Sequence, residues 1–130
     1  MLLHLDPHGG PPIYQQIIEQ VQRLILGGQL RPGDQVEQVR ALAERLRVNP
    51  MTVSKAYGLL ERDGFLERRR GIGLFVATVG RETERRVRDR FLDDAFRKAA
   101  AAALQMGLSA KDSHELLDEM LRRFRRDSAG

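Results

Sequence analysis

The sequence predicts a mainly α-helical fold with a small β-hairpin, arranged as a winged helix-turn-helix followed by a two-helix dimerisation tail. Three observations support this prediction. Apolar residues recur at helical spacing in several separate stretches of the chain. One of these stretches, residues 50–63, carries helix-start and helix-stop signals at its two ends. Directly behind it, residues 65–77 have the pattern of two short strands around a glycine-containing tip.

Residues 1–11 are predicted to form an extended arm at the start of a first domain that spans residues 1–78. The prolines and glycines of this stretch disfavour a helix. His4 and His8 lie in it, but no carboxylate cluster with metal-ligand spacing follows them. A flexible arm is therefore favoured over a metal site.

Two amphipathic helices are expected after the arm. Apolar residues step by three and four from Pro12 to about Leu26, where Gly27 ends the pattern, and residues 31–34 form a turn. A second helical pattern runs from Val36 to Val48. Because residues 47–50 leave only a short connection, this second helix and the next must meet at a steep angle, as they do in a helix-turn-helix.

The third predicted helix, residues 50–63, has both of its ends encoded in the sequence. The side-chain oxygen of Asn49 can accept a hydrogen bond from a free backbone N–H at the helix start. Pro50 suits the first helical position, and Gly64 can take the left-handed conformation that ends a helix. One face of this helix is apolar, with Val53, Ala56, Tyr57, Leu60 and Leu59.

The opposite face of this helix carries short hydroxyl groups and a cation near its N-terminal end: Met51, Thr52, Ser54 and Lys55. Such a face is suited to contacts with base edges in the major groove of DNA. An ordinary solvated helix surface is the alternative, since serine, threonine and lysine are common there.

The hairpin predicted at residues 65–77 is interpreted as a wing. Its first strand ends in three consecutive arginines, Arg68 to Arg70, and Gly71 lies at its tip. Guanidinium groups and a glycine backbone at such a tip can approach phosphates or enter a minor groove. A charged, exposed strand without this role is the alternative. The helix-turn-helix pattern directly upstream favours the wing.

Residues 79–130 are predicted to form a helical dimerisation domain. A long helix is expected over residues 81–106, with an alanine run at 99–103 that lets a partner helix come close. Gly107 ends it, and Ser109 is a plausible N-cap for a final helix. Two such helices cannot cover both apolar stripes by themselves, which favours self-association. The expected dimer residues are Val87, Phe91, Ala95, Ala99, Leu117, Met120, Leu121 and Phe124.

Composition excludes several classes of protein. The chain has 130 residues and a formal net charge of +4, and this basic balance favours an anionic partner. It has no cysteine, which excludes disulfides, thiolate metal sites and cysteine nucleophiles. No apolar run is long enough for a membrane span, and no signal peptide is evident, so a cytoplasmic location is expected. The chain has no paired carboxylates on a recognisable loop, and His114 with Glu115 and Asp118 lacks a third distant ligand. We therefore predict no enzyme activity, no metal and no cofactor.

Several motifs in order resemble the DNA-binding domain of GntR-type bacterial transcription regulators. They are Pro-Ile-Tyr-Gln-Gln-Ile at 12–17, Leu-Arg-Pro-Gly-Asp at 30–34, Val-Arg-Ala-Leu-Ala at 39–43, Val-Asn-Pro-Met-Thr-Val-Ser-Lys-Ala-Tyr at 48–57 and Arg-Arg-Gly-Ile-Gly-Leu-Phe-Val at 69–76. The tyrosine of the first motif and the Asn-Pro-x-Thr-Val of the fourth are most similar to the YtrA-like branch. The similarity covers about residues 11–78.

The resemblance implies which residues contact DNA. In that family the arginine after the start of the second helix reaches DNA, and here it is Arg40. With the pattern of the third helix and the wing, the predicted DNA-binding residues are Arg40, Asn49, Met51, Thr52, Ser54, Lys55, Arg69, Arg70 and Gly71. Three departures from the family pattern stand near them: Glu37-Gln38 in place of a Pro-Ser pair, Gly58 inside the third helix, and Ile72 at the wing tip.

Three functions are compatible with a basic helical protein of this kind. The favoured function is a homodimeric repressor that binds a palindromic DNA operator and controls an operon. The resemblance implies that this operon contains transporter genes. The alternative is an effector-responsive sensor. Its small-molecule pocket would lie at the dimer interface, because the roughly 50 residues after the wing are too few to enclose a cavity of the usual size. A pure protein-interaction adaptor would leave the basic residues of the helix-turn-helix and wing without a purpose.

Overall fold

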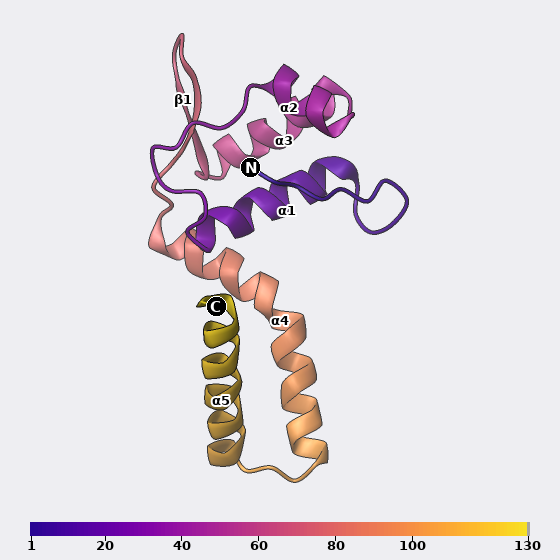
Figure 1. Ribbon diagram of the computed structural model, residues 1–130, viewed down its shortest axis with the longest axis vertical. Helices are drawn as coiled ribbons and strands as arrows, with labels where there is room; N and C mark the ends of the chain where they lie inside the picture. Colours follow the sequence, from indigo (N-terminus) through magenta and orange to yellow (C-terminus); the bar gives the residue numbers. More distant parts are fainter. Residues whose placement is uncertain (130) are drawn as a thin grey trace. The chain divides into compact units, whose positions relative to one another are not determined.

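The computed structural model describes residues 1–129 and divides the chain into two compact units, Met1–Arg88 and Asp89–Gly130. We call the first unit the head and the second the tail. The helices are α1 (Ile13–Leu26), α2 (Val39–Leu46), α3 (Pro50–Arg62), α4 (Arg81–Gln105) and α5 (Ala110–Ala129), and a hairpin of β1 (Leu66–Arg69) and β2 (Gly73–Val76) follows α3. The mainly helical fold with one small hairpin is confirmed (Figure 1). In the described part of the chain, no helix is both long and apolar enough to span a membrane.

The head is built around α3, which packs against both α1 and α2. Most of its apolar stripe is enclosed: Val53, Ala56 and Leu60 have no exposed surface, whereas Leu59 at the edge of the stripe is half-buried. Ile17 and Val21 of α1, Leu42 of α2 and Phe65 behind α3 complete this core. The helical spacing predicted for these stretches therefore points inward, as an amphipathic helix requires.

Both predicted ends of α3 are present. The Asn49 side chain accepts a hydrogen bond of 2.8 Å from the Met51 backbone N–H, and Pro50 occupies the first helical position. At the other end, Gly64 has a φ of +83°, a conformation that only glycine adopts without strain. This fixes where α3 starts and stops.

The second helix begins later than the sequence suggested. We expected helical structure from Val36, whereas α2 starts at Val39 and its N-cap, Gln38, makes no side-chain capping bond. Val36 instead donates its backbone N–H to the Leu74 carbonyl at 3.0 Å, and Gln35 forms an isolated antiparallel bridge with Phe75. The chain before α2 therefore pairs with β2, and this pairing replaces the first helical turn.

The N-terminal arm is extended, as predicted, and side-chain hydrogen bonds hold it against α1. The amide of Gln16 accepts from the Asp6 N–H at 2.8 Å and donates to the Asp6 carbonyl at 2.7 Å. One turn later, Gln20 forms the same pair with His4, at 2.8 and 2.6 Å. Leu3, a residue of the arm itself, is buried. Two glutamines one turn apart on α1 thus bind the backbone of alternate arm residues, in the way that a neighbouring β-strand binds an extended chain.

The hairpin is a short antiparallel ladder in which Leu66 pairs with Val76 and Arg69 with Gly73. Gly71, in the tight connection, has a φ of +78°. The inner side chains Leu66 and Val76 are buried. Figure 1 shows the hairpin extending away from the helices of the head.

The start of α4 belongs to the head. Val87 is only 1% exposed within the single chain, and the first unit therefore continues to Arg88, past the boundary expected at residue 78. Because its surface is already buried, Val87 has nothing to offer a partner chain. This removes Val87 from the predicted dimerisation residues.

The tail has no core of its own. Residues 106–109 turn the chain so that α5 runs antiparallel to the second half of α4 (Figure 1). No side chain from Asp89 to Ser128 is buried. The large apolar residues that remain exposed are Leu92, Phe96, Leu104, Met106, Leu116, Leu117, Met120, Leu121 and Phe124.

Tyr57 supplies a testable feature of the head core. Its hydroxyl donates to the Glu37 carbonyl at 2.8 Å, and burial raises the pKa of this phenol above its ordinary value of 10.0. Tyr57→Phe leaves that carbonyl without its partner and is expected to lower the free energy of unfolding by about 1–3 kcal/mol.

The effect of Tyr57→Phe should shrink in alkali. A phenol whose native pKa is raised contributes its full stability below pH 10, and this contribution is lost as the pH rises above 10, because the unfolded chain ionises first. Denaturant unfolding of both proteins between pH 7 and 11 measures the difference. A difference that stays constant above pH 10 would contradict the buried state of this phenol.

Candidate nucleic-acid interface

The outward face of α3 presents the predicted contact residues. Met51 is 78% exposed, Ser54 and Lys55 are exposed, and Thr52 is half-buried. The buried residues on the opposite side of the helix fix this orientation, because they lock the rotation of α3 within the head. Hydroxyl groups, a thioether and a cation therefore lie together at the N-terminal half of the helix.

Asn49 has a structural role in addition to its predicted contact with DNA. Its side-chain oxygen is the acceptor of the α3 cap, so its amide NH₂ is the group left for a ligand. Arg40, the second residue of α2, is exposed. In the described part of the chain it forms no ion pair. The structure thus leaves the Arg40 guanidinium available for an anionic partner.

The wing arginines differ in how they are held. Arg68 lies 3.4 Å from a Glu61 carboxylate oxygen and Arg69 lies 3.2 Å from that of Glu67. The Arg69 guanidinium also sits over the Phe75 ring, 4.0 Å from its centroid. These exposed ion pairs are weak and exchange readily for other anions. Arg70 is exposed and has no carboxylate partner among residues 1–129.

The wing tip is a glycine-framed turn with one apolar residue. Ile72 is 59% exposed, and its backbone N–H donates to the Arg69 carbonyl at 2.9 Å. Gly71 and Gly73 on either side have positive φ values. An apolar side chain is therefore held outward at the tip, beside Arg69 and Arg70.

Glu37, one of the departures noted in the sequence, anchors the segment before α2. Its carboxylate receives two hydrogen bonds from Arg45, at 2.6 and 3.1 Å, and this lowers the pKa of the Glu37 carboxyl. Arg45 also donates to the Met1 carbonyl at 2.6 Å. This network could not be predicted from the sequence, because a glutamate and an arginine eight residues apart give little local signal.

Tyr14 is a second residue of this surface that could not be predicted from the sequence. It is the second residue of α1, and the Lys55 Nζ lies 3.8 Å from the centroid of its ring. The contact joins α1 to the exposed face of α3. No periodicity within either helix indicates it, because the two residues belong to different helices.

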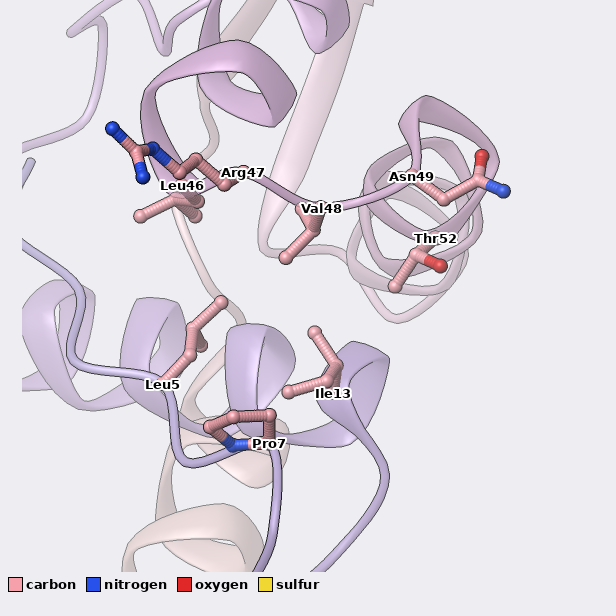
Figure 2. Close-up of a pocket in the computed structure, with 8 residues that line it drawn as sticks. All are labelled: Leu5, Pro7, Ile13, Leu46, Arg47, Val48, Asn49 and Thr52. Carbon is pink, nitrogen blue, oxygen red and sulfur yellow. The ribbon is translucent and has the colours of Figure 1, made fainter.

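An open groove runs beside the N-terminus of α3 (Figure 2). It has a volume of about 570 Å³ and is lined by Leu5, Pro7, Ile13, Leu46, Arg47, Val48, Asn49 and Thr52. Leu5 and Ile13 point toward Val48 across it. The fixed arm forms one wall of the groove, so the arm shapes the surface next to the α3 contact residues.

Comparison with known proteins agrees with this geometry. The family model for bacterial regulatory proteins of the gntR family matches residues 13–76. The HTH-type transcriptional repressor YtrA of Bacillus subtilis (strain 168) is 34% identical over 119 residues, covering 92% of each chain. The chain belongs to the GntR family. It is a transcription regulator with a DNA-binding domain, and its similarity to the YtrA-like branch is confirmed.

Solved structures support the same assignment. YtrA from Sulfolobus acidocaldarius, a GntR-family transcription factor, is 29% identical, with a TM-score of 0.55 over 93% of this chain and 97% of that one. A transcriptional regulator from Oenococcus oeni shares the fold, with a TM-score of 0.68, 22% identity and coverage of 92% and 99%. The relatives are transcription regulators and not enzymes, which confirms that prediction.

Gly58 stands on the same exposed face of α3 as Ser54 and Lys55. A Cβ added there meets no atom within 4 Å. Gly58→Ala is therefore expected to raise the free energy of unfolding by about 0.5–1 kcal/mol, since glycine inside a helix is unfavourable relative to alanine. Thermal unfolding measures this change.

The control for Gly58→Ala is Gly64→Ala, which should destabilise the protein because Gly64 has a φ of +83°. A destabilised Gly58→Ala variant would contradict the open space seen around this position. Operator binding by Gly58→Ala gives the second readout. Unchanged affinity would indicate that the glycine at this position has no role in DNA binding. Lower affinity with retained stability indicates that DNA approaches the helix closely there.

Proposed function

We propose that this GntR regulator is a homodimeric repressor that binds a palindromic operator through α3 and the hairpin wing. The observation that carries the proposal is the orientation of α3. Its apolar side is enclosed in the head core, while Met51, Ser54 and Lys55 face outward together. A helix held in this way presents its polar face outward, and the major groove of DNA is wide enough to admit an α-helix.

The surrounding cations support a DNA-binding mode with distinct roles. Lys55, Thr52 and Ser54 are assigned to base edges or nearby phosphates in the major groove. Arg40 from α2 and Arg70 from the wing have exposed side chains suited to phosphates. Arg69 can exchange its weak pair with Glu67 for a phosphate, since the pair is exposed at both partners.

The tail supports dimerisation. Residues 89–128 form two helical segments without a single buried side chain, so the single chain lacks the hydrophobic stabilisation that helices in water need. The exposed residues of α5 form one stripe: Leu116, Leu117, Met120, Leu121 and Phe124. Packing this stripe against a second copy, together with Phe91, Ala95 and Ala99 of α4, would supply the missing core.

The charges of α5 favour an antiparallel arrangement of the two copies. The first half of the helix is acidic beside the apolar stripe, with Asp112, Glu115, Asp118 and Glu119. The second half is basic, with Arg122, Arg123, Arg125 and Arg126. Antiparallel pairing across a two-fold axis places acidic halves against basic halves, whereas parallel pairing would oppose like charges. A two-fold dimer matches a palindromic operator.

The repressor role rests on the similarity to YtrA of Bacillus subtilis, which is described as a transcriptional repressor. Binding across a promoter by two heads would block access of the transcription machinery to that DNA. The sequence resemblance also implies an operon of transporter genes as the target.

Selection of genomic DNA fragments by the purified protein tests this proposal. Recovered fragments should share two inverted half-sites whose centres are separated by about one helical turn, 10–10.5 base pairs, or a multiple of it. Sedimentation should show a dimer at micromolar concentration. Fragments without a common inverted repeat would contradict the operator proposal, and a monomer would contradict the dimer.

A further inference from the structure

Two residues from different helices meet at the edge of the outward face of α3. The Lys55 Nζ lies over the ring of Tyr14, 3.8 Å from the ring centroid. Tyr14 is half-buried and Lys55 is exposed. The described part of the chain gives Lys55 no carboxylate partner, so the aromatic face is the group that orients its ammonium.

We propose that Tyr14 is a positioning residue that holds the ammonium group of Lys55 ready for DNA. This inference rests on the proposed function, because it assigns a role within the same DNA-binding surface. Lysine has a long side chain that loses considerable rotamer freedom when it is fixed on a ligand. A cation held in place before binding has already lost part of this freedom, which leaves more of the interaction energy for affinity.

The kind of contact matters. A cation over an aromatic ring keeps its full charge, and N–H donors that point away from the ring stay free for a ligand. A carboxylate partner would neutralise the cation and would have to be displaced by DNA. Arg68 and Arg69 of the wing have such partners, whereas Lys55 has none among residues 1–129. The surface therefore orients Lys55 without placing a negative charge beside the DNA phosphates.

The support for Tyr14 is rigid. It stands in the first turn of α1, and α1 packs directly on α3 through the head core. Residues that flank it, such as Ile17 one turn later, are buried. The ring is therefore fixed relative to Lys55 by the same packing that fixes α3. The orientation of the Lys55 ammonium group therefore depends on α1, the first helix of the head.

A double-mutant cycle in the full-length dimer tests the inference. The variants are Tyr14→Leu, Lys55→Ala and the combination, with Tyr14→Phe as the matched variant that keeps the ring and removes the hydroxyl. Affinity for the operator recovered by genomic selection is measured for each protein. Contacts of this kind at exposed sites correspond to about a two- to fivefold change in an equilibrium constant. Tyr14→Leu should weaken binding by about that factor at each half-site.

The cycle has a specific expected pattern. Tyr14→Leu should reduce affinity when Lys55 is present and have little effect in the Lys55→Ala background, and Tyr14→Phe should bind nearly as well as the natural protein. An equal loss in both backgrounds would overturn the positioning role, because Tyr14 would then act by itself. Weak binding by Tyr14→Phe would also overturn it, since the hydroxyl would be the group that matters. Tighter binding by Tyr14→Leu would show that the ring competes with DNA for Lys55, which is the opposite of positioning.

A measurement on the free protein separates this inference from the proposed function. Ring currents should shift the Lys55 ε-methylene protons upfield in the NMR spectra of the natural protein and of Tyr14→Phe, and the shift should vanish in Tyr14→Leu. Its absence from the natural protein would refute the contact regardless of DNA. If the shift is present but Lys55→Ala binds the operator with unchanged affinity, the proposed contact of Lys55 with DNA fails, and the positioning role fails with it. Thermal unfolding of Tyr14→Leu shows whether the head is intact.

Discussion

Replacing Leu117 and Leu121 together with glutamate is expected to convert the dimer into monomers at micromolar concentration. These side chains are 40% and 41% exposed in the single chain, and both belong to the apolar stripe of α5. In the proposed dimer the substitutions would place four carboxylates in a surface that excludes water, where unpaired charges are strongly unfavourable. Sedimentation equilibrium measures the change in mass directly.

The same double substitution should weaken binding to a palindromic operator by about 10²- to 10⁴-fold, because linkage of two binding units normally supplies a factor of this size. Binding to a single half-site should change little. Leu2→Glu is the matched control, since Leu2 is 78% exposed but lies in the head. It should leave both mass and operator affinity unchanged. A Leu117→Glu/Leu121→Glu protein that remains dimeric would contradict the assignment of α5 to the interface.

Truncation after Arg88 gives an independent form of this test. The fragment keeps every residue of the head, including the buried Val87, and is expected to fold as a monomer that binds one half-site. A cut after Ala77 would remove Val87 and leave its cavity open to water. The shorter fragment should therefore be less stable by roughly 1–3 kcal/mol.

The features that could be predicted from the sequence are those with local signals. Asn49 and Pro50 start α3 because a cap and a proline act within one turn of themselves. The hairpin follows from Gly71, whose positive φ closes a tight connection. The apolar spacing of α1 and α3 also identifies their buried faces, because a single helix axis relates all of the residues concerned.

The features that were missed depend on contacts between distant parts of the chain. Prolines and glycines do indicate a non-helical arm, but its attachment depends on the amides of Gln16 and Gln20, whose partners lie 10 and 16 residues away. Val87 fits the helical stripe of the tail equally well, yet the head buries it. Periodicity shows that a face is apolar and does not show what covers it.

The predicted start of α2 was wrong for a related reason. Val36 fits the helical pattern, but its backbone is used by β2. Helix propensity is weak compared with such tertiary hydrogen bonds. Within the candidate interface, the cations could be predicted from the sequence, because charge on an exposed helix face is visible there. Tyr14, the aromatic partner of Lys55, could not be predicted, because it belongs to a different helix.

Arg40→Ala and Lys55→Ala are expected to cause the largest single-residue losses of operator affinity. Each side chain is exposed in the head without a carboxylate partner in the described residues, so each can give its full charge to DNA. Loss of a base contact should cost about 1–3 kcal/mol and relax the preference at one base pair of each half-site. Loss of a phosphate contact should weaken binding to all sequences alike.

The dependence of affinity on salt separates these two outcomes. Each phosphate contact that is lost should lower the slope of log affinity against log salt by about one, or about two for a dimer with two heads. Arg97→Ala is the control, because it removes the same charge from the tail, where Arg97 pairs with Asp93 at 2.7 Å. It should leave affinity and slope unchanged. Unaltered affinity and an unaltered salt slope for both Arg40→Ala and Lys55→Ala would refute the assignment of α2 and α3 to the DNA surface.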